Sequence, residues 1–412
     1  MRCGLIGEKL SHSYSPLIHR MLGDYGYDLI CVSPSELDSF FADNDLHGFN
    51  VTIPYKKSAI PFCKKLHSSA EKIGCVNTIV RDKDGGYCGY NTDYPGFLYM
   101  CRRAGIVFKS KKVLILGSGG TGLTASAAAA DQGACEVITV SRNGVANYGN
   151  LHQHKDADII INTTPVGMYP NNGESLIDLR GFPQCSGVID VIYNPLKTRL
   201  ILQAEAMGIP CSGGLPMLVA QAKYASEIFT GSEIDDGRIE EILTKLYKAI
   251  CNVVLIGMPG CGKTEAGKLV AKLLNREFVD IDSEIVKKAG MSIPEIFSQK
   301  GKPFFRTLEA DAVEEIGKLS GKVIATGGGS VLLEKNRLNL KQNGLVFFLK
   351  RSPELLSTEG RPLSKSLEAL MEMQRIREPI YRAMCDAEID SSGTLRQAAD
   401  SLMEVFHAYP YN

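Results

Sequence analysis

Two stretches of the chain share one order of apolar and polar residues: a short apolar run, a glycine-rich turn and then a helical pattern. The apolar runs cover residues 112–116 and 253–256, and the turns after them cover 117–122 and 257–264. Uninterrupted apolar strands are typical of parallel sheets that helices cover on both faces. The pattern therefore predicts two separate α/β sheets, each beginning at one of these strands.

An additional αβ region precedes the first glycine turn, and a helix separates the two sheets. Apolar residues at helical spacing after an acidic start predict an amphipathic helix over 235–250. No Gly-, Ser- or Pro-rich linker separates this helix from the second apolar run, so we expect a stiff junction that fixes the orientation of the two halves. We predict domains at 1–100 and 101–230, terminal helices and the junction at 231–250, and a last domain at 252–412.

The amino-acid composition argues against several classes of protein. Lys and Arg number 46, as do Asp and Glu, so the formal net charge is zero and no basic field indicates binding to nucleic acid or to an anionic membrane. The apolar start is too short for a signal peptide, and no later run approaches the ~20 apolar residues of a membrane span. The 12 Cys contain no CxxC pair, which argues against a zinc site or a disulfide framework and favours reduced thiols in a cytoplasm.

The first glycine turn fits a dinucleotide. Its G-x-G-x-x-G spacing follows a strand and opens a helix, and its residues are Gly117, Ser118, Gly119, Gly120, Thr121 and Gly122. Glycines there let the backbone approach a pyrophosphate at a helix N-terminus, although a purely structural turn is the alternative. Ser141 and Arg142 follow the next strand, where an acidic residue would bind the ribose of NAD. Because Arg attracts a 2′-phosphate instead, NADP is favoured over NAD.

The second glycine turn is a complete P-loop for ATP. The sequence Gly257-x-x-x-x-Gly262-Lys263-Thr264 follows a strand directly. Backbone N–H groups of such a loop surround the phosphates, the lysine neutralises the β- and γ-oxygens, and the Ser or Thr ligates Mg²⁺. We therefore expect ATP to bind at Gly260, Cys261, Gly262, Lys263, Thr264 and Glu265.

Several short polar motifs in residues 1–248 occur together in a recognisable order. They are Ser11-His12-Ser13-Tyr14-Ser15-Pro16, Asn50-Val51-Thr52-Ile53-Pro54-Tyr55-Lys56, Gly74-Cys75-Val76-Asn77-Thr78, Asn91-Thr92-Asp93, Ile161-Asn162-Thr163-Thr164-Pro165-Val166-Gly167-Met168, Asp190-Val191-Ile192-Tyr193-Asn194-Pro195, and the run Gly213–Gln221. Each alone is explained by helix caps, turns or surface charges. Together they closely resemble shikimate dehydrogenase.

That resemblance implies a fold and a set of site residues. The fold is an αβ substrate domain followed by a Rossmann-type dinucleotide domain. The residues implied to bind the carboxylate and hydroxyls of shikimate are Ser13, Ser15, Thr52, Asn77, Tyr193 and Gln221. Lys56 and Asp93 are implied to be the catalytic pair, and Val191 and Gly214 to lie near the nicotinamide.

Hydride arrival at the 3-ketone of dehydroshikimate leaves negative charge on oxygen, which a cation stabilises and can protonate. Lys56 is suited to that role. We expect Asp93 mainly to orient Lys56 and the substrate, because a carboxylate favours the charged form of a neighbouring lysine.

The residues expected to bind the adenine end of the dinucleotide differ from the family pattern. Ser141-Arg142-Asn143 stands where relatives usually have Asn-Arg-Thr, and residues 144–147 contain none of the further basic residues often found there. The interval between Arg142 and the next strand at 158 is also too short for a full helix and an extra strand. We therefore predict a reduced preference for NADP over NAD.

The motifs after the P-loop resemble shikimate kinase across residues 252–412, which implies a P-loop fold of the nucleoside-monophosphate-kinase type. They include Asp280-Ile281-Asp282, Phe304-Phe305-Arg306, Gly327-Gly328-Gly329, Gly360-Arg361-Pro362-Leu363 and Arg377-Glu378-Pro379-Ile380-Tyr381. By this resemblance Arg306, Arg377 and Gly328 bind shikimate, while Asp282 contacts its hydroxyls and orients or deprotonates the nucleophile. Asp280 is implied to lie near Mg²⁺, and Arg361 to belong to a lid over ATP. Glu309 is expected to be a salt-bridge partner of Arg306.

The two resemblances fit one chemical sequence, since the first enzyme creates the 3-hydroxyl that the second phosphorylates. We therefore predict a bifunctional enzyme of aromatic amino-acid biosynthesis that uses NADP(H), ATP and Mg²⁺ on small-molecule substrates. A non-catalytic sensor of the same metabolites is the alternative from another class, and a first domain that also oxidises quinate is a nearer one. The sequence gives no oligomeric state.

Overall fold

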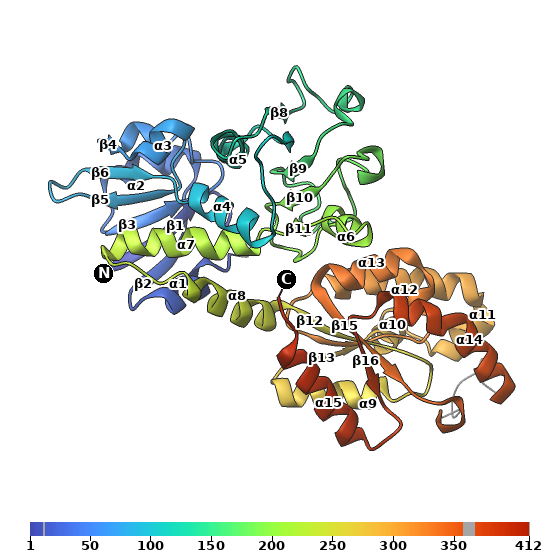
Figure 1. Cartoon of the computed structure of the whole chain (residues 1–412). Helices are drawn as coiled ribbons and strands as arrows, with labels where there is room; N and C mark the ends of the chain where they lie inside the picture. The colour runs from blue at the N-terminus through green and yellow to red at the C-terminus, as the bar shows by residue number, and fades with distance from the viewer. Residues whose placement is uncertain (11–12, 357–366, 412) are drawn as a thin grey trace. The chain divides into compact units, whose positions relative to one another are not determined.

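The computed structural model describes residues 1–10, 13–356 and 367–411. These residues form two compact units (Figure 1). The first unit contains Met1–Tyr193 and Thr198–Leu246, and the second contains Asn194–Lys197 and Tyr247–Tyr411.

The first unit begins with a mixed six-stranded sheet. Its strands, in the order β2-β1-β3-β5-β6-β4, are β1 Arg2–Gly7, β2 Gly26–Cys31, β3 Gly48–Val51, β4 Lys65–Leu66, β5 Thr78–Arg81 and β6 Tyr87–Tyr90. Strands β1, β2 and β3 are mutually parallel, whereas β5 runs antiparallel to both β3 and β6. The β3–β5 register sets Asn50 opposite Thr78. The ends of the two strands that carry the polar motifs therefore lie next to each other.

The second sheet of this unit is fully parallel. Its strands, in the order β11-β10-β9-β7-β8, are β7 Lys112–Leu116, β8 Glu136–Val140, β9 Ile159–Asn162, β10 Gly187–Asp190 and β11 Cys211–Ser212. Side chains alternate along a strand, so Val113 and Ile115 enter one core while Leu114 and Leu116 enter another. Burial on both faces explains why the sequence of β7 is an uninterrupted apolar run.

Helices cover both sheets of the first unit. They are α1 Ser15–Leu22, α2 Leu37–Ala42, α3 Ser68–Ile73, α4 Asp93–Arg103, α5 Gly120–Asp131, α6 Arg199–Ala206 and α7 Leu215–Thr230, with short 3₁₀ turns η1 Pro34–Glu36, η2 Ile60–Phe62, η3 Leu151–His154 and η4 Leu179–Gly181. Helix α4 leaves the first sheet and packs along α7 and against α5. The polar motif at the start of α4 is thereby placed between the two sheets. Helix α8, Gly237–Ile250, follows and leads directly into the next strand.

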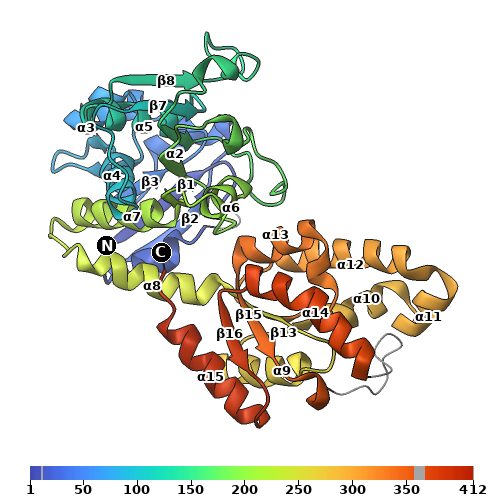
Figure 2. The same ribbon diagram turned by 45° about the vertical axis from the view of Figure 1, so that its right-hand side comes forward.

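The second unit is a parallel five-stranded sheet with helices on both faces. Its strands, in the order β13-β14-β12-β15-β16, are β12 Asn252–Ile256, β13 Phe278–Asp280, β14 Val323–Ala325, β15 Gly344–Lys350 and β16 Ala387–Asp390. Its helices are α9 Lys263–Leu274, α10 Ile281–Ala289, α11 Ile293–Gln299, α12 Gly301–Gly317, α13 Glu334–Asn343, α14 Leu367–Met384 and α15 Leu395–Ala408, with turns η5 Ser330–Leu332 and η6 Pro353–Leu355. Helices α9 and α15 lie on one side of this sheet, and α12 and α13 on the other (Figures 1 and 2).

The mixed α/β architecture with parallel sheets confirms the predicted fold class. The short connection between Arg142 and β9 holds only the turn η3, so β8 is the outermost strand of its sheet. No helix in the described part of the chain is long and apolar enough to cross a membrane. The domain boundaries at residues 100, 230 and 250, and the fixed orientation of the two halves, stay predictions.

Candidate active sites

A lysine–carboxylate pair lies at the start of α4. Lys56 Nζ is 2.5 Å from Asp93 Oδ2, and both side chains are largely buried, with 16% and 7% of their surface exposed. Asp93 is the first residue of α4, where the helix dipole favours a negative charge. The aliphatic part of Lys56 also lies against the cofactor turn, because a Cβ on Gly120 would be 3.3 Å from Lys56 Cδ. The pair therefore stands between the substrate-side sheet and the glycine turn.

Asn77 connects this pair to its surroundings. Its Nδ2 donates to Asp93 Oδ1 at 3.0 Å and lies 3.5 Å from Gln221 Oε1, while its Oδ1 accepts from the N–H of Thr92 at 2.7 Å. Both oxygens of Asp93 are thus occupied, one by Lys56 and one by Asn77. The sequence motifs that supplied these four predicted residues meet at one place.

A buried polar network extends from this place toward the predicted carboxylate site. Asn50 Nδ2 donates to Thr78 Oγ1 at 2.9 Å, and Asn50 Oδ1 accepts from the hydroxyl of Tyr27 at 2.6 Å. Burial raises the pKa of Tyr27 well above its usual value, and a hydrogen bond with Ser15 opposes that rise. Sequence reasoning assigned Asn50 no role at the site, and only the β3–β5 register reveals it.

The remaining residues predicted to bind the substrate have fewer contacts with the Lys56–Asp93 pair. Ser13 Oγ and Ser15 Oγ lie 3.1 Å apart, and the ring of Tyr193 packs at 5.8 Å from that of Tyr14. Between described residues, no side-chain hydrogen bond joins Thr52 or Tyr193 to the Lys56–Asp93 pair.

The first glycine turn is built for close backbone approach. Gly117 has φ +111, and a Cβ there would be 2.7 Å from Thr163 Oγ1. A Cβ on Gly122 would be 2.3 Å from the carbonyl oxygen of Gly117, so positions 117 and 122 admit only glycine. Ser118 and Gly119 are exposed, which leaves the N-terminus of α5 open to an anion.

The other predicted cofactor residues lie at the same edge of the sheet. Gly117 N–H donates to the carbonyl of Val140 at the end of β8, and Ser141 and Arg142 follow directly. Gly214 approaches the backbone of Val191 so closely that a Cβ would lie 2.0 Å from its carbonyl oxygen. These positions are at the carboxyl ends of parallel strands, the usual place of nucleotides in such sheets.

Three glycines of the P-loop in the second unit have positive φ angles, which glycine adopts most readily. Gly257, Gly260 and Gly262 have φ values of +145, +88 and +94. Lys263 Nζ donates to the carbonyls of Gly257 and Met258 at 3.0 Å each, so the ammonium group lies folded back on the loop. Cys261 is buried, whereas the Glu265 side chain is exposed and pairs with Lys268 at 3.0 Å.

Oxygen donors gather beside the P-loop. Thr264 Oγ1 donates to Asp280 Oδ2 at 2.8 Å. Burial, together with the charges of Asp280 and Glu309, raises the pKa of Asp282 to about 6, against the lowering effect of Lys263 and Arg306. In the described part of the chain no three His, Cys, Asp or Glu side chains cluster as a metal site of their own.

The predicted shikimate residues of the second unit surround the Gly327–Gly329 turn. A Cβ on Gly327 would be 2.8 Å from Asp282 Oδ1, and one on Gly329 would be 2.3 Å from Arg306 Nη2. Arg377 Nη1 donates to the carbonyl of Gly328 at 3.0 Å. Arg361 lies outside the described residues. All the described predicted residues of this group therefore come together.

Three supporting side chains of this turn were not predicted as site residues. The hydroxyl of Tyr381 donates to the carbonyl of Gly328 at 2.5 Å, next to Arg377. Glu309, with 1% of its side chain exposed, forms the expected salt bridge with Arg306 and accepts from Ser330 Oγ at 2.6 Å. The spacing of four residues between Arg377 and Tyr381 is the one sequence signal that could have indicated a shared helix face.

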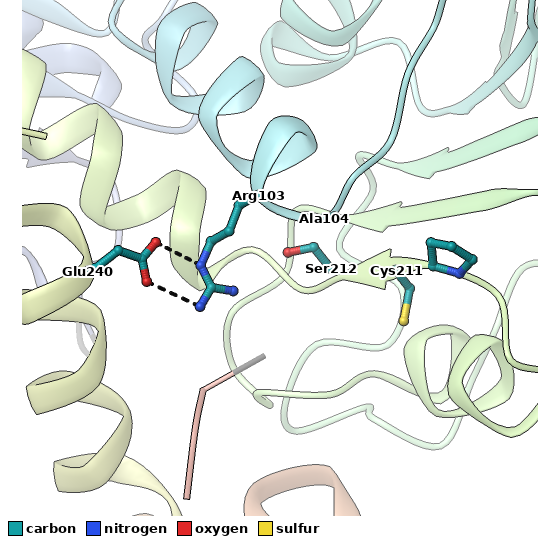
Figure 3. A pocket seen from close by; sticks show the side chains of 6 residues that line it. Arg103, Ala104, Cys211, Ser212 and Glu240 are labelled. Atoms are coloured by element: carbon teal, nitrogen blue, oxygen red, sulfur yellow. Dashed lines mark hydrogen bonds and ion pairs between the residues drawn. The ribbon is translucent and has the colours of Figure 1, made fainter. Parts of the chain in front are cut away.

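A pocket of about 500 Å³ lies elsewhere in the first unit (Figure 3). Its lining residues are Arg103, Ala104, Pro210, Cys211, Ser212 and Glu240. Arg103 and Glu240 face each other there as an ion pair at 2.9 Å. No predicted site residue lines this pocket.

Comparison with known proteins identifies the relatives of both units. A family model described as the shikimate dehydrogenase substrate binding domain matches residues 5–79. The shikimate dehydrogenase (NADP(+)) of Clostridium perfringens strain 13 is 34% identical over 265 residues, which cover 59% of this chain and 97% of that protein. The chain belongs to the shikimate dehydrogenase family.

A second family model, shikimate kinase, matches residues 259–407. The chain is therefore a bifunctional fusion of a shikimate dehydrogenase with a shikimate kinase domain, which confirms the prediction from the sequence motifs.

Two solved structures are similar to the dehydrogenase part. One is a chorismate mutase/shikimate 5-dehydrogenase fusion protein from Clostridium acetobutylicum, with a TM-score of 0.56 and 35% identity, covering 59% of this chain and 96% of that one. The other is quinate dehydrogenase from Corynebacterium glutamicum in complex with NAD, with a TM-score of 0.54 and 26% identity, covering 60% of this chain and 99% of that one.

Proposed function

We propose that the first unit reduces 3-dehydroshikimate to shikimate with NADPH, and that the second phosphorylates the 3-hydroxyl of shikimate with ATP. The observation that carries the first half is the buried Lys56–Asp93 pair at 2.5 Å, placed against the Gly120 turn. The second half rests on the P-loop together with Asp282, Arg306 and Arg377 around Gly327–Gly329.

In the reduction, NADPH supplies a hydride to the C3 carbonyl carbon. The carbonyl π-electrons move to the oxygen. The cationic ammonium group of Lys56 stabilises the negative charge on this oxygen and then protonates it, which gives the alcohol. Asp93 holds the ammonium group of Lys56 in place through one carboxylate oxygen, and Asn77 holds the other oxygen of Asp93. Electrostatic stabilisation of this kind is often the largest single contribution to catalysis.

In the phosphorylation, the substrate 3-hydroxyl attacks the γ-phosphorus, the new O–P bond forms and ADP leaves. Asp282 accepts the hydroxyl proton, a role that its raised pKa suits. Arg306 and Arg377 bind the carboxylate of shikimate, and Lys263 leaves the Gly257 carbonyl to contact the phosphates.

Mg²⁺ fits the donors present. Thr264 Oγ1 and Asp280 Oδ2, 2.8 Å apart at the end of the P-loop, are the hard oxygen ligands that Mg²⁺ prefers. When bound, Mg²⁺ neutralises charge on the phosphate oxygens. Thr264 and Asp280 would hold it.

A reducing cytoplasm suits this protein. All 12 cysteines lie in described residues and are free thiols, several of them buried. Disulfides form in oxidising compartments, so free thiols throughout the chain support a cytoplasmic site of action.

Quinate is a second candidate substrate of the first unit, because the chain is similar to a quinate dehydrogenase over nearly all of that protein. Steady-state rates with quinate and NAD⁺, compared with shikimate and NADP⁺, decide this. Turnover of quinate at less than about a thousandth of the shikimate rate excludes it, a difference of about 4 kcal/mol in the activation barrier.

Two matched variants test the assignment of the two activities. Lys56→Ala should lower ketone reduction by about 10²- to 10⁴-fold and leave phosphorylation of shikimate unchanged. Lys263→Ala should do the reverse, so each variant is the folding control of the other. Loss of both activities in either variant, or of neither, contradicts the assignment.

A further inference from the structure

A buried carboxylate joins the ends of two neighbouring strands in the dinucleotide-binding sheet. Asp190 is the last residue of β10 and is fully buried, with 0% of its surface exposed. Asn162, the last residue of β9, donates from Nδ2 to both carboxylate oxygens, at 3.1 and 3.2 Å. Thr198 Oγ1 donates to Oδ2 at 2.7 Å. These three residues are called the Asp190 clamp below.

Burial of a carboxylate at this position has a high free-energy cost of desolvation. Burial raises the pKa of Asp190 to about 6, although the hydrogen bonds from Thr198, Ile192 and Asn162 lower it. A neutral side chain would carry no such desolvation cost. A carboxylate is nevertheless the group that accepts several converging donors at once, and bonds to an ionised acceptor are the stronger ones.

The clamp fixes the segment that follows β10. Ile192 N–H donates to Asp190 Oδ1 at 3.0 Å, and Val191 N–H donates to the carbonyl of Asn162 at 3.0 Å. From the other side, Gly214 N–H donates to the carbonyl of Ile192 at 2.8 Å, and its missing side chain lets it touch Val191. Val191 and Ile192 are thereby held from the ends of three strands, and Tyr193 follows them directly.

The same network orders the loop after β9. Asn162 Oδ1 accepts from Thr164 N–H at 3.0 Å and from Thr164 Oγ1 at 2.7 Å, and its Nδ2 also lies 3.3 Å from the carbonyl of Val166. Both loops therefore take their shape from one buried group of side chains. They lie at the carboxyl edge of the sheet, where a nucleotide is expected.

We propose that Asp190 is a positioning residue for hydride transfer: through Asn162 and Thr198 it fixes residues 191–193 between the nicotinamide and the substrate. This inference rests on the proposed function, in which Val191 and Gly214 lie near the nicotinamide and Tyr193 contacts the substrate. Reacting atoms must approach to about 3–3.5 Å with correct alignment, so a small movement of this segment slows the chemical step.

The experiment compares Asp190→Asn and Thr198→Val with Thr198→Ser in the full chain. Asp190→Asn makes one acceptor oxygen a donor that faces other donors, and Thr198→Val removes one hydroxyl without changing shape. Thr198→Ser keeps that hydroxyl. For each, kcat, the KM values, the primary isotope effect with 4-deuterated NADPH, the melting temperature and the kinase rate are measured. Binding and fluorescence of NADPH without substrate give a readout that does not depend on turnover.

The inference predicts that both disrupting variants lower kcat by about 10- to 100-fold, raise the isotope effect on kcat and change the fluorescence of bound NADPH. Thr198→Ser should keep kcat within about threefold of the unaltered chain, and the kinase rate should stay constant throughout. If Asp190→Asn does not fold, Thr198→Val decides by the same readouts.

A fall in kcat that only follows the folded fraction, with the isotope effect, KM and NADPH fluorescence unchanged, makes the clamp merely structural and overturns the inference. An unchanged kcat in both disrupting variants overturns it as well. If the unaltered chain itself does not oxidise NADPH with 3-dehydroshikimate, the proposed function fails first, and the inference fails with it.

Discussion

The two carboxylates that we propose to take part directly in catalysis, Asp93 and Asp282, have different surroundings, and their proposed roles differ accordingly. Asp93 has both oxygens occupied, one by the ammonium group of Lys56 and one by the amide of Asn77. It is suited to orientation rather than to proton transfer. Asp282 lies near the acidic residues Asp280 and Glu309, and its pKa is raised to about 6.

The raised pKa of Asp282 predicts a pH dependence of the kinase. Asp282 must be ionised to accept a proton, and its pKa in the folded protein is about 6 instead of the usual 3.8. As the pH falls through about 6 the carboxylate is protonated, and kcat/KM should fall about tenfold for each further pH unit. The measurement is kcat/KM for shikimate phosphorylation between pH 5 and pH 8.

Asp282→Asn provides the control, since it cannot titrate and its residual activity should lose this acid limb. An acid limb near pH 4, as for an ordinary aspartate, contradicts the role of burial at this site.

At the scale of strands and turns, most of the fold could be predicted from local sequence patterns. The apolar runs of β7 and β12 and the glycines after them predicted parallel sheets and nucleotide turns, because buried strands and left-handed backbone each restrict the residue type. The site residues inside recognisable motifs, such as Lys56 and Asp93, could be predicted by resemblance. Their mutual approach in the structure is consistent with that prediction.

Residues that act through distant partners escaped sequence reasoning. Asp190 contacts Asn162 only because β9 and β10 are neighbours in the sheet. It contacts Thr198 only because the chain after β10 turns back toward the end of that strand. Asn50 meets Thr78 only through the register of β3 and β5. In one sequence such residues look like strand ends or caps, since nothing local distinguishes a structural amide from one that holds an active site.

The short adenine side predicts a reduced cofactor preference. Only the turn η3 lies between Arg142 and β9, and β8 forms the edge of the sheet. Arg142 is therefore the one basic residue that residues 141–147 offer to a 2′-phosphate. We predict that kcat/KM for NADPH exceeds that for NADH by less than about a thousandfold, which is about 4 kcal/mol.

Arg142→Ala should remove most of the remaining preference while leaving the rate with NADH nearly constant. A discrimination of a thousandfold or more in the unaltered chain, or a preference that survives this substitution, shows that other residues bind the phosphate.

At the scale of the whole molecule, two consecutive reactions share one chain. The first unit produces the 3-hydroxyl that the second phosphorylates, and each unit has its own parallel five-stranded sheet with a glycine-rich turn. The chemistry thus explains why these two folds occur together. A sensor of the same metabolites would keep the binding residues and lose the catalytic ones, whereas the residues that we propose to be catalytic, Lys56, Asp93, Lys263 and Asp282, are all present.

One measurement tests this account most directly: the unaltered chain is supplied with 3-dehydroshikimate, NADPH and MgATP, and products are followed by ³¹P NMR together with NADPH absorbance. We predict that NADPH is oxidised and that shikimate 3-phosphate and ADP appear. Omitting NADPH should abolish the phosphorylated product, and omitting ATP should leave shikimate. Binding of the metabolites with no product from either reaction would contradict the account and favour a sensor.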